Sequence, residues 1–577
     1  MANLRIFDNL ASELIRQGKL TESQLSECTR IMKNSNRSLQ EVLIKNFKLS
    51  EKEIYEVIAK GLNVEYVDAD EYFDKIDDYT LEAIPEELAL VNNIMPIIRQ
   101  GIKVKVLTGD PSNDELKAKL ESSTGLSVTF VLGKEKSIHN LVWYYYKDKQ
   151  AKAKLDDLAS QVVREVGNDS SNAEVRTNTN VLTAAASNAD SNPTVKLLNS
   201  IFEIASYKHA SDIHITPYED KAQICLRVDG LLTLLTEIPV RACSEIVARI
   251  KIFCDLKTDE KRKGQDGVLR YKGIGNTELE MRVSILPVLY GESVVMRVVD
   301  KNGLQYDLDT LGLLDKDKQN FVEFIGNPYG LLLVTGPTGS GKTTTLYTAL
   351  KKVIEERPNT NIITVEDPVE QQLAGIKQLK LNSSIGFGFD EALRGILRHD
   401  PDILLIGEIR DKETADIAIR AASTGHLVLS TLHTNDAVSA VYRMVDLGVE
   451  PFMLSSVLVG TMAQRLVRKV CPHCMAEREI TSTEAETLGI DKGTTVKFGK
   501  GCALCSQTGY SGRTAVYETV KVDEELRKGI IAKSDVDTLT DIAERQGMRS
   551  LKTNCRDLVL EGTTSPQEAI RVIFSKD

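Results

Sequence analysis

The sequence predicts a multidomain α/β protein, and three observations support this fold class. With 577 residues the chain is too long for a single hydrophobic core. From about residue 315 to about residue 470, β-branched apolar runs alternate with helical stretches, which is the pattern of an α/β core. Across residues 146–192 the apolar periodicity fades into a stretch rich in Asn, Ser, Ala and Asp, which is typical of a flexible linker.

Composition narrows the class of protein and its location. A hydrophobic content of 42% with 27% charged residues is ordinary for a globular protein. No apolar run approaches the roughly 18 residues of a membrane-spanning helix, and the start, MANLRIFDNLASELIRQG, is not a signal peptide. We therefore expect a cytosolic protein that reaches a membrane only through partners. The net charge of −11 argues against nonspecific binding to nucleic acid or anionic lipid.

The N-terminal region, residues 1–145, is predicted to be a separate module. Its first 65 residues have the pattern of short amphipathic helices with a near-repeat, LASELIRQGKL and later LQEVLIKNFKL. Strand-like pieces such as IKVKVLTG and LSVTFVLG then indicate a small α/β part. After the linker, order is expected to resume with the helical TVKLLNSIFEIASYKHA and a series of alternating strands.

The segment LLLVTGPTGSGKTTTLYTAL, residues 331–350, carries a complete phosphate-binding motif, GxxxxGK[ST], between a strand-like run and a helical one. Its glycines let backbone N–H groups approach phosphate oxygens, while the helix N-terminus, a lysine and a threonine add a dipole, a charge and a Mg²⁺ ligand. A chance glycine-rich turn is the alternative. The motif predicts binding of ATP or GTP by Gly336, Pro337, Thr338, Gly339, Ser340, Gly341, Lys342, Thr343 and Thr344.

Hydrolysis also needs acidic residues that support Mg²⁺ and orient or deprotonate the attacking water. NIITVEDPVE places Glu366 and Asp367 at the end of a predicted strand, and PDILLIGEIRD places Glu408 at the end of another. Gly407 stands where the usual Walker B aspartate would be. Carboxylates at strand ends can also cap helices or lie in solvated turns. Two such segments behind a phosphate loop favour a catalytic site.

Two histidines flank a third predicted strand in STGHLVLSTLHTN, residues 423–435. His426 and His433 either sense the γ-phosphate or the water through a relay, or are packed and surface side chains. The sequence alone leaves both interpretations open.

The nine cysteines are not expected to form disulfides in the cytosol, and four of them fall into two CxxC pairs. CPHC and CALC place Cys471 and Cys474 in one pair and Cys502 and Cys505 in the other. This spacing is typical of a closed tetrahedral zinc site, in which the metal is structural. A redox CxxC or a chance pairing is the alternative, and His473 is not expected to be a ligand.

Together these segments resemble the secretion-ATPase superfamily, specifically the type II secretion and type IV pilus assembly ATPases. The resemblance runs from about residue 190 to about residue 575. Besides the phosphate loop, it is carried by ASDIHITPYE, RVDG, GQDG, MRVSILPVLYGESVVMRVVD, TVEDPVEQQLAGIKQL, EALRGILRHDPDILLIGEIRD, AASTGHLVLSTLHTNDA, QRLVRKVCPHC, GCALCSQTGYSGRTAVYE and GMRSLKTNCRDLVLEGTTSPQEAIRV. It implies a PAS-like α/β N2 domain over 193–305 and a RecA-like ATPase domain over 306–577 with an inserted zinc module at 471–505.

The resemblance also implies residue roles. The segment of Glu366 matches the family's Asp box, with this glutamate as general base, and that of Glu408 matches the Walker B box, where Glu408 lies near Mg²⁺ and Gly407 is family-typical. The segment of His426 and His433 matches the His box. Arginines that reach phosphates, some from a neighbouring subunit, match Arg227, Arg249, Arg394, Arg398 and Arg410. Arg227 and Arg398 match best, and surface ion pairs are the alternative for all five.

Family members form hexamers on the cytoplasmic face of the inner membrane and turn a platform protein that inserts pilin into a fibre. The resemblance thus implies ATP, Mg²⁺ and a structural Zn²⁺, and an extension or secretion motor, because retraction ATPases lack both the tetracysteine loop and the long N-terminal region. We expect pilus assembly first, with a type II secretion motor as the alternative. A DNA translocase is disfavoured by the acidic balance and by the lack of interleaved aromatic and basic residues, and a non-hydrolysing scaffold by the presence of both carboxylates.

The N-terminal module resembles the cyclic-di-GMP-binding (MshEN) domain of some relatives, whose tandem motif opens Arg-Leu-Gly. Here the two copies open Asn9-Leu10-Ala11 and Ser38-Leu39-Gln40, and Phe47 replaces a later glycine, while Gly18 is kept. Asn or Ser cannot stack on guanine as Arg does. We therefore expect a degenerate docking module for a cytoplasmic-ring membrane component, without cyclic-di-GMP binding.

Overall fold

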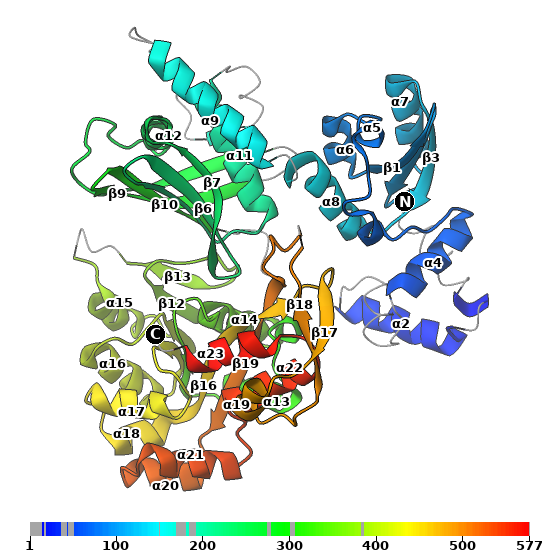
Figure 1. Cartoon of the computed structure of the whole chain (residues 1–577). Coiled ribbons are helices and arrows are strands. Elements are labelled where there is room, and N and C mark those ends of the chain that lie inside the picture. Colours follow the sequence, from blue (N-terminus) through cyan, green and yellow to red (C-terminus); the bar gives the residue numbers. More distant parts are fainter. Residues whose placement is uncertain are drawn as a thin grey trace. The chain divides into compact units, whose positions relative to one another are not determined.

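The computed structural model describes residues 14–16, 19–35, 43, 51–148, 151–168, 181–183, 192–273, 278–299, 306–381, 386–502 and 504–575. The chain divides into two compact units, one of Met1–Val228 with Leu232–Val298 and one of Asp229–Leu231 with Val299–Asp577 (Figure 1). The finer boundaries expected at 145, 192 and 305 remain predictions. Among the described residues, no helix is both long and apolar enough to cross a membrane.

In the described residues before 65, the N-terminal part of the first unit contains helices α2 (Glu22–Ser35) and α4 (Glu51–Leu62), as the amphipathic pattern predicts. A three-stranded sheet follows, in the order β1-β2-β3, with β1 and β2 antiparallel and β2 and β3 parallel. Its strands are β1 (Met95–Gln100), β2 (Lys103–Thr108) and β3 (Ser127–Leu132), and its helices are α5 (Asp78–Leu81), α6 (Glu86–Asn92), α7 (Asp114–Thr124) and α8 (Glu135–Trp143). The 3₁₀-helix η1 (Ala69–Tyr72) and the π-helix η2 (Tyr144–Asp148) complete this part.

Helix α9 (Ala151–Asn168) lies inside the segment 146–192 that we expected to be a flexible linker, so the structure differs from that expectation. Leu155, Leu158, Ala159 and Val162 are buried in one core with helix α11 (Pro193–Tyr207), beside which α9 runs in Figure 1. These four residues recur at i, i+3, i+4 and i+7, which makes one apolar helix face. Residues 169–180 and 184–191, with the strongest linker composition, lie outside the described residues.

A seven-stranded sheet forms the rest of the first unit, in the order β4-β8-β9-β10-β5-β6-β7. Along its strands, buried side chains alternate with more exposed ones. In β6, for example, Ala222, Ile224 and Leu226 belong to the same core as residues of α11 and of α12 (Val240–Phe253). The elements are β4 (Val181–Thr183), β5 (Asp212–Pro217), β6 (Lys221–Val228), β7 (Leu231–Pro239), α12 (Val240–Phe253), β8 (Gln265–Lys272), β9 (Glu278–Val288) and β10 (Gly291–Val299).

The second unit contains the predicted α/β core, a seven-stranded sheet in the order β13-β12-β14-β15-β11-β16-β19. Neighbouring strands from β13 to β16 are parallel, and β19 pairs antiparallel with β16. The strands are β11 (Gly330–Thr335), β12 (Ile362–Glu366), β13 (Lys377–Lys380), β14 (Ile403–Ile406), β15 (Leu427–Leu432), β16 (Leu458–Val470) and β19 (Tyr510–Lys521). Because the parallel strands share one direction, the loops that follow them meet at one edge of the sheet.

Both faces of this sheet are covered by helices, because its central strands are apolar on both sides. Leu331 and Leu333 of β11 belong to the core on one face, and Leu332 and Val334 belong to the core on the other. The helices are η4 (Leu308–Thr310), α13 (Asp315–Gly326), α14 (Lys342–Glu356), α15 (Phe389–Ile396), α16 (Lys412–Ser423), α17 (Ser439–Asp446), α18 (Pro451–Val457), α20 (Glu524–Ile531) and α21 (Val536–Arg545).

A smaller module is inserted between β16 and β19. It contains the antiparallel pair β17 (Met475–Glu479) and β18 (Thr495–Gly499) and helix α19 (Ser482–Leu488). Thr481 and Glu484 form a capping box at the start of α19. Their side chains accept hydrogen bonds from backbone N–H groups that the first turn of the helix leaves unpaired. A separate core joins this module to the last two helices, α22 (Leu551–Leu560) and α23 (Pro566–Phe574).

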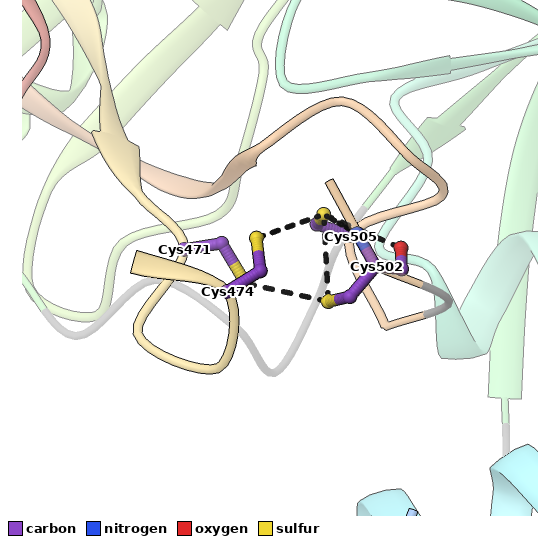
Figure 2. A group of neighbouring side chains, drawn as sticks. All are labelled: Cys471, Cys474, Cys502 and Cys505. Carbon is purple, nitrogen blue, oxygen red and sulfur yellow. Dashed lines mark hydrogen bonds between the residues drawn. The ribbon is translucent and has the colours of Figure 1, made fainter. Parts of the chain in front are cut away.

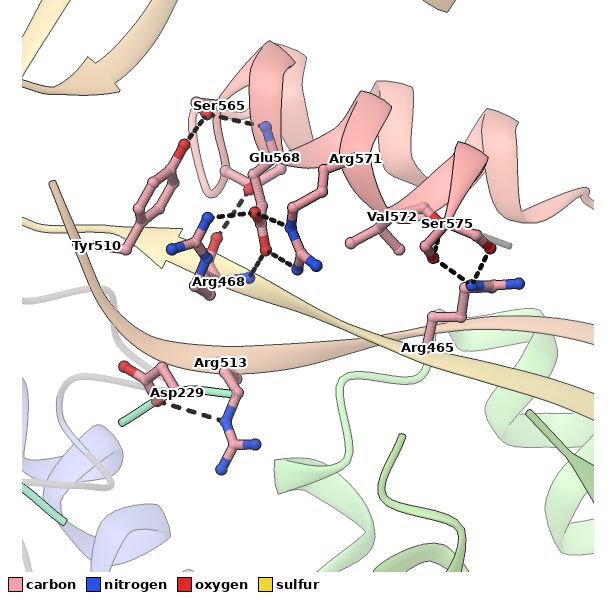
Figure 3. Close-up of polar contacts among 11 residues, drawn as sticks. Asp229, Arg465, Arg468, Tyr510, Arg513, Ser565, Glu568, Arg571, Val572 and Ser575 are labelled. Carbon is pink, nitrogen blue, oxygen red and sulfur yellow. Dashed lines mark hydrogen bonds and ion pairs between the residues drawn. The ribbon is translucent and has the colours of Figure 1, made fainter. Parts of the chain in front are cut away.

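Helix α23 is held on β16 by a buried ion network around Glu568, which is 1% exposed. Its carboxylate accepts hydrogen bonds from Arg468 Nη2 at 2.7 Å and from Arg571 Nε at 2.8 Å (Figure 3). The guanidinium of Arg468 lies 4.1 Å above the ring of Tyr510, whose hydroxyl is 2.6 Å from Ser565 Oγ. Burial raises the pKa of Glu568, but the hydrogen bonds from Arg571 and Arg468 outweigh it and lower that pKa.

Candidate active site

The phosphate-binding loop joins β11 to α14 at the carboxyl edge of the parallel sheet, as the motif predicts. Gly336, Gly339 and Gly341 have φ values of 142°, 77° and 90°, which only glycine adopts without strain. The loop also lies close to β16, since a Cβ on Gly336 would come within 2.3 Å of the carbonyl oxygen of Gln464. The glycines therefore serve both the turn and this close approach.

The polar groups of the loop fit a triphosphate. Lys342 Nζ donates hydrogen bonds to the carbonyl oxygens of Gly336 at 2.6 Å and Pro337 at 3.0 Å, so its charge lies inside the loop. Ser340 is 2% exposed, and its Oγ has no hydrogen-bond partner among the described residues. Thr338, Gly339 and Thr343 are exposed at the rim. A partly buried cation, an unpartnered hydroxyl and an open rim suit an anionic ligand.

Glu366 ends strand β12 and is 4% exposed. Its Oε2 accepts a hydrogen bond from the hydroxyl of Tyr347 at 2.6 Å, and its Oε1 accepts one from Thr364 Oγ1 at 2.6 Å. Gln378 Nε2 also reaches Oε1, at 3.4 Å. Burial is the main cause that raises the pKa of Tyr347, followed by its hydrogen bond to Glu366, so the phenol stays a donor.

Glu408 follows β14 and lies between Arg410 and His433. Its Oε1 pairs with the guanidinium of Arg410, and its Oε2 lies 3.4 Å from His433 Nε2. Burial raises the pKa of Glu408, but the hydrogen bond and charge of Arg410, together with His433, outweigh it and lower that pKa. The group is therefore an ionised carboxylate, which is the form that binds Mg²⁺.

Gly407, in the usual place of an aspartate, lets β14 approach β12. Its backbone N–H donates to the carbonyl oxygen of Val365 at 2.9 Å, and a Cβ on Gly407 would lie 3.2 Å from that oxygen and 3.5 Å from Glu366 Cα. A larger residue here would press on the strand end that carries Glu366. The departure from the usual Walker B pattern therefore has a packing reason.

The two histidines lie at opposite ends of β15, so only one of them is near the carboxylates. His433 follows the strand at its carboxyl end, beside Glu408. His426 precedes the strand, and its Nδ1 lies 2.9 Å from the carbonyl oxygen of Ala421 and 3.2 Å from Thr424 Oγ1. The structure thus places His426 in the turn after α16 and does not bring it together with His433.

The five candidate arginines are divided between the two units. Arg227 and Arg249 are in the first unit, where Arg227 Nε is 3.5 Å from Asp212 Oδ2 and Arg249 lies over the ring of Phe253. In the second unit, Arg394 pairs with Glu413 at 2.6 Å. Arg398 is exposed, and its guanidinium forms no ion pair within the described part of the chain.

Cys471, Cys474, Cys502 and Cys505 come together as the two CxxC pairs predict, with their Sγ atoms all within 4.8 Å of one another (Figure 2). Sγ–Sγ distances are 3.9 Å for Cys471 and Cys502, 3.8 Å for Cys474 and Cys505, and 3.6 Å for Cys502 and Cys505. Tetrahedral Zn–S bonds of about 2.3 Å place sulfur atoms about 3.8 Å apart. The N–H groups of Cys502 and Gly509 each donate a hydrogen bond to Cys505 Sγ at 3.2 Å, which favours the thiolate form of this sulfur.

Tyr347, Gln464 and Thr434 take part in the site but were not predicted from the sequence. Tyr347 had a signal, because it lies one helical turn after Thr343 in the phosphate-binding motif. Gln464 had none, since its Oε1 accepts from Thr345 Oγ1 at 2.8 Å across 119 residues. Thr434 Oγ1 lies 2.7 Å from Thr335 Oγ1, which ties the His433 segment to the end of β11.

The family model described as "Type II/IV secretion system protein" matches residues 187–571, more than half of the chain. The protein belongs to this family. It is 38% identical over 567 residues to the type IV pilus assembly ATPase PilB of Myxococcus xanthus, covering 97% of this chain and 98% of the relative. Type II secretion system protein E of Pseudomonas aeruginosa is 44% identical over 385 residues, which are 66% of this chain and 76% of that protein.

A solved structure and a second family model also resemble parts of this chain. The ATPase DotB of Legionella pneumophila shares the fold with a TM-score of 0.50 at 22% identity, covering 66% of this chain and 95% of DotB. The family model "MshEN domain" matches residues 62–152, so the N-terminal module of this secretion-system protein contains such a domain. The degenerate tandem motif at Asn9–Ala11 and Ser38–Gln40 lies outside the described residues, and its expected loss of cyclic-di-GMP binding stays a prediction.

These findings identify the protein as an ATP-hydrolysing member of the secretion family. The full-length match to a pilus assembly ATPase agrees with the extension-motor branch that the motifs predicted. The match to protein E supports the secretion alternative over a shorter part of the chain.

Proposed function

We propose that the protein is the motor of type IV pilus extension. A homohexamer on the cytoplasmic face of the inner membrane hydrolyses ATP, and rotation of its N2 domain against the ATPase domain acts on a platform protein that adds pilin to the fibre. The N-terminal module docks the motor on a cytoplasmic-ring membrane component. The observation that carries this proposal is the 38% identity to a pilus assembly ATPase over 97% of the chain, the N-terminal module included.

In this proposal the loop from Gly336 to Thr344 holds the phosphates, and Glu366 takes the proton of the attacking water. Glu408 and the hydroxyl of Thr343 hold Mg²⁺, which when bound neutralises charge on the phosphates. His433, 3.4 Å from Glu408, senses that charge through the carboxylate. Support comes from the shared sheet edge at which all these residues follow parallel strands.

Arginines complete the proposed site, some of them from a neighbouring subunit. Arg398 is the favoured one in the ATPase domain because it has no ion-pair partner in the described part of the chain. Arg394 and Arg410 must first leave Glu413 and Glu408. In the N2 domain Arg227 is favoured over Arg249, and it likewise exchanges Asp212 for a phosphate.

We assign the four-cysteine site to a structural Zn²⁺, with no open position for a substrate. The sulfur spacing supports a tetrahedral metal, and the closeness of the two cysteine pairs favours zinc over a redox disulfide pair. The ion holds together the two ends of the module inserted between β16 and β19.

A type II secretion motor is the second candidate, and it is favoured by the higher identity, 44%, to protein E over 385 residues. Disruption of the gene separates the two functions. Loss of surface fibres with normal protein secretion supports pilus extension, whereas loss of secreted proteins with intact fibres supports the alternative.

ATP turnover of the purified full-length protein tests the proposed chemistry. We expect Glu366→Ala to bind ATP but to lose turnover by at least about 100-fold, which is the usual contribution of a general base. Zinc content and oligomer size are measured on the same samples, with one zinc per chain and a hexamer expected. Glu370→Ala is the matched control, because this exposed glutamate lies four residues further along the same segment.

Three outcomes would overturn parts of the proposal. If Glu366→Ala keeps its turnover, Glu366 is not the base and Glu408 takes that place. If the wild-type protein does not turn over even with its membrane partners, the motor assignment is wrong. If the samples contain no metal, the structural zinc is wrong.

A further inference from the structure

In the described part of the chain, the carboxylate of Glu366 is buried without a cationic partner. Within the described part of the chain, no lysine, arginine or histidine forms an ion pair with it. Its contacts are the hydroxyl of Tyr347 from α14, the hydroxyl of Thr364 from β12 and the amide of Gln378 from β13. A buried carboxylate of this kind depends on such hydrogen-bond donors for its orientation.

Tyr347 is the donor that connects this carboxylate to the phosphate-binding loop. Its helix, α14, begins at Lys342, so the phenol is rigidly linked to the loop five residues earlier. The side chain is 0% exposed, and its ring packs edge to face against Tyr306 with centroids 5.5 Å apart. A phenylalanine would fill the same space, so the hydroxyl is the part of the residue that packing does not explain.

The rest of the network fixes the phenol from the other side. Gln378 Nε2 lies 3.5 Å from the hydroxyl of Tyr347 and donates to the carbonyl oxygen of Gln371 at 2.9 Å, while its Oε1 accepts from the N–H of Leu373 at 2.7 Å. Gln378 therefore connects the segment after Glu366 to the hydroxyl of Tyr347 and to the carboxylate. Because its ring is packed and its hydroxyl lies in this network, Tyr347 is suited to hold the carboxylate of Glu366 in one orientation.

We propose that Tyr347 is a positioning residue for ATP hydrolysis, which orients the carboxylate of Glu366 and links it to the helix of the phosphate-binding loop. The inference rests on the proposed function, because the role of Glu366 as general base is part of that proposal. Any displacement of α14 on nucleotide binding moves the hydroxyl that Glu366 accepts from, so loop and base respond together.

Tyr347→Phe removes the hydroxyl and keeps the ring. A carboxylate that loses a hydrogen-bond donor is held less firmly in one orientation. We therefore expect kcat at neutral pH to fall roughly ten-fold and KM for ATP to change less than about two-fold, a split that a purely structural residue would not produce. Tyr442→Phe is the control, since it removes a hydroxyl bonded to the Ser534 carbonyl oxygen outside the site.

Stability supplies a readout that does not depend on turnover. Tyr347→Phe should lower Tm by only about 2–4 °C, because one buried hydrogen bond is lost while the ring that fills the core is kept. Thr364→Val removes the second hydroxyl while keeping a β-branched residue in β12, and it should also lower kcat with little change in KM. This second variant keeps the test decisive if Tyr347→Phe does not fold.

The outcomes separate this inference from the proposed function. If Glu366→Gln abolishes turnover but Tyr347→Phe leaves kcat unchanged, the positioning role is wrong and the base assignment stands. If Tyr347→Phe lowers Tm while kcat is unchanged, the hydroxyl is only structural. If Glu366→Gln keeps wild-type turnover, the base assignment itself is wrong.

Discussion

The carbonyl oxygen of Gln464 lies directly against Gly336, the first glycine of the phosphate-binding loop. A Cβ on Gly336 would come within 2.3 Å of that oxygen and 2.9 Å of Ser340 Oγ. The side chain of Gln464 also reaches the loop, because its Nε2 would lie 2.8 Å from a Cβ on Gly341. Strand β16 therefore packs directly against the loop, and the loop has no room to move toward this strand.

Gly336→Ala should weaken ATP binding, because the new Cβ would meet backbone that cannot rotate away. We expect Kd for ATP to rise at least about ten-fold and the free energy of unfolding to fall by about 1–3 kcal/mol. Gly339→Ala is the comparison, since Gly339 has a φ of 77° but nothing within 4 Å of a Cβ. That variant should cost only about 1 kcal/mol of strain. Fluorescence titration and thermal unfolding measure both effects, and equal losses in the two variants would contradict the argument.

Gly407→Asp should lower activity, although it restores the usual Walker B residue. The Cβ would lie 3.2 Å from the carbonyl oxygen of Val365, and the new carboxylate would stand beside Glu366 and Glu408. Like charges this close repel one another and would displace the carboxylates that the reaction uses. We expect kcat to fall at least about ten-fold at neutral pH, measured by steady-state ATP turnover.

Gly326→Asp is the control for this substitution, because Gly326 is exposed and has nothing within 4 Å of a Cβ. Its turnover should stay within about two-fold of wild type. Higher activity in Gly407→Asp than in wild type would show that the missing aspartate is a defect rather than a packing requirement.

The sequence predicted those parts of the site whose residues lie close together in the chain. The phosphate-binding motif and the two CxxC pairs lie within short segments, so their spacing alone predicted the loop and the sulfur cluster. His426 and His433 show the limit of that reasoning. They are seven residues apart, but an extended strand between them places them at opposite ends of β15.

Contacts between distant segments could not be predicted in the same way. Gln464 meets the phosphate-binding loop only because β16 pairs with β11, and no local pattern encodes that pairing. Helix α9 is a different case, because its apolar spacing was present at Leu155, Leu158, Ala159 and Val162. The polar composition of the segment after it concealed this amphipathic face, so the whole stretch was predicted to be a linker.

Glu568→Gln should destabilise the second unit most at neutral pH. Glu568 has a pKa lowered from 4.5, so its ionised form contributes stability above the unfolded pKa, and this contribution is lost as pH falls through the folded value. Replacing it leaves the buried guanidinium of Arg468 without its counter-charge, which costs about 3 kcal/mol. Chemical denaturation at several pH values between about 3 and 7 measures the difference.

The matched control is Glu561→Gln, at the exposed end of α22. It should change the free energy of unfolding by less than about 0.5 kcal/mol at every pH. The gap between wild type and Glu568→Gln should narrow as the pH falls below about 4. A gap that stays constant with pH would mean that the charge of Glu568 contributes nothing and that only its packing matters.

Cys502→Ser should remove the metal and loosen the module that contains β17 and β18. A serine hydroxyl is a poor ligand for zinc, and three thiolates hold the ion much less tightly than four. We expect metal analysis to give one zinc per chain in wild type and almost none in the variant, with a lower Tm, because metal binding contributes to folding free energy. Cys225→Ser, outside the cluster, should keep its zinc.

Treatment of wild type with a strong chelator should reproduce the loss of Tm, and added zinc should restore it in wild type but not in Cys502→Ser. A Tm that does not respond to chelator in wild type would show that the four sulfur atoms are held by the fold alone.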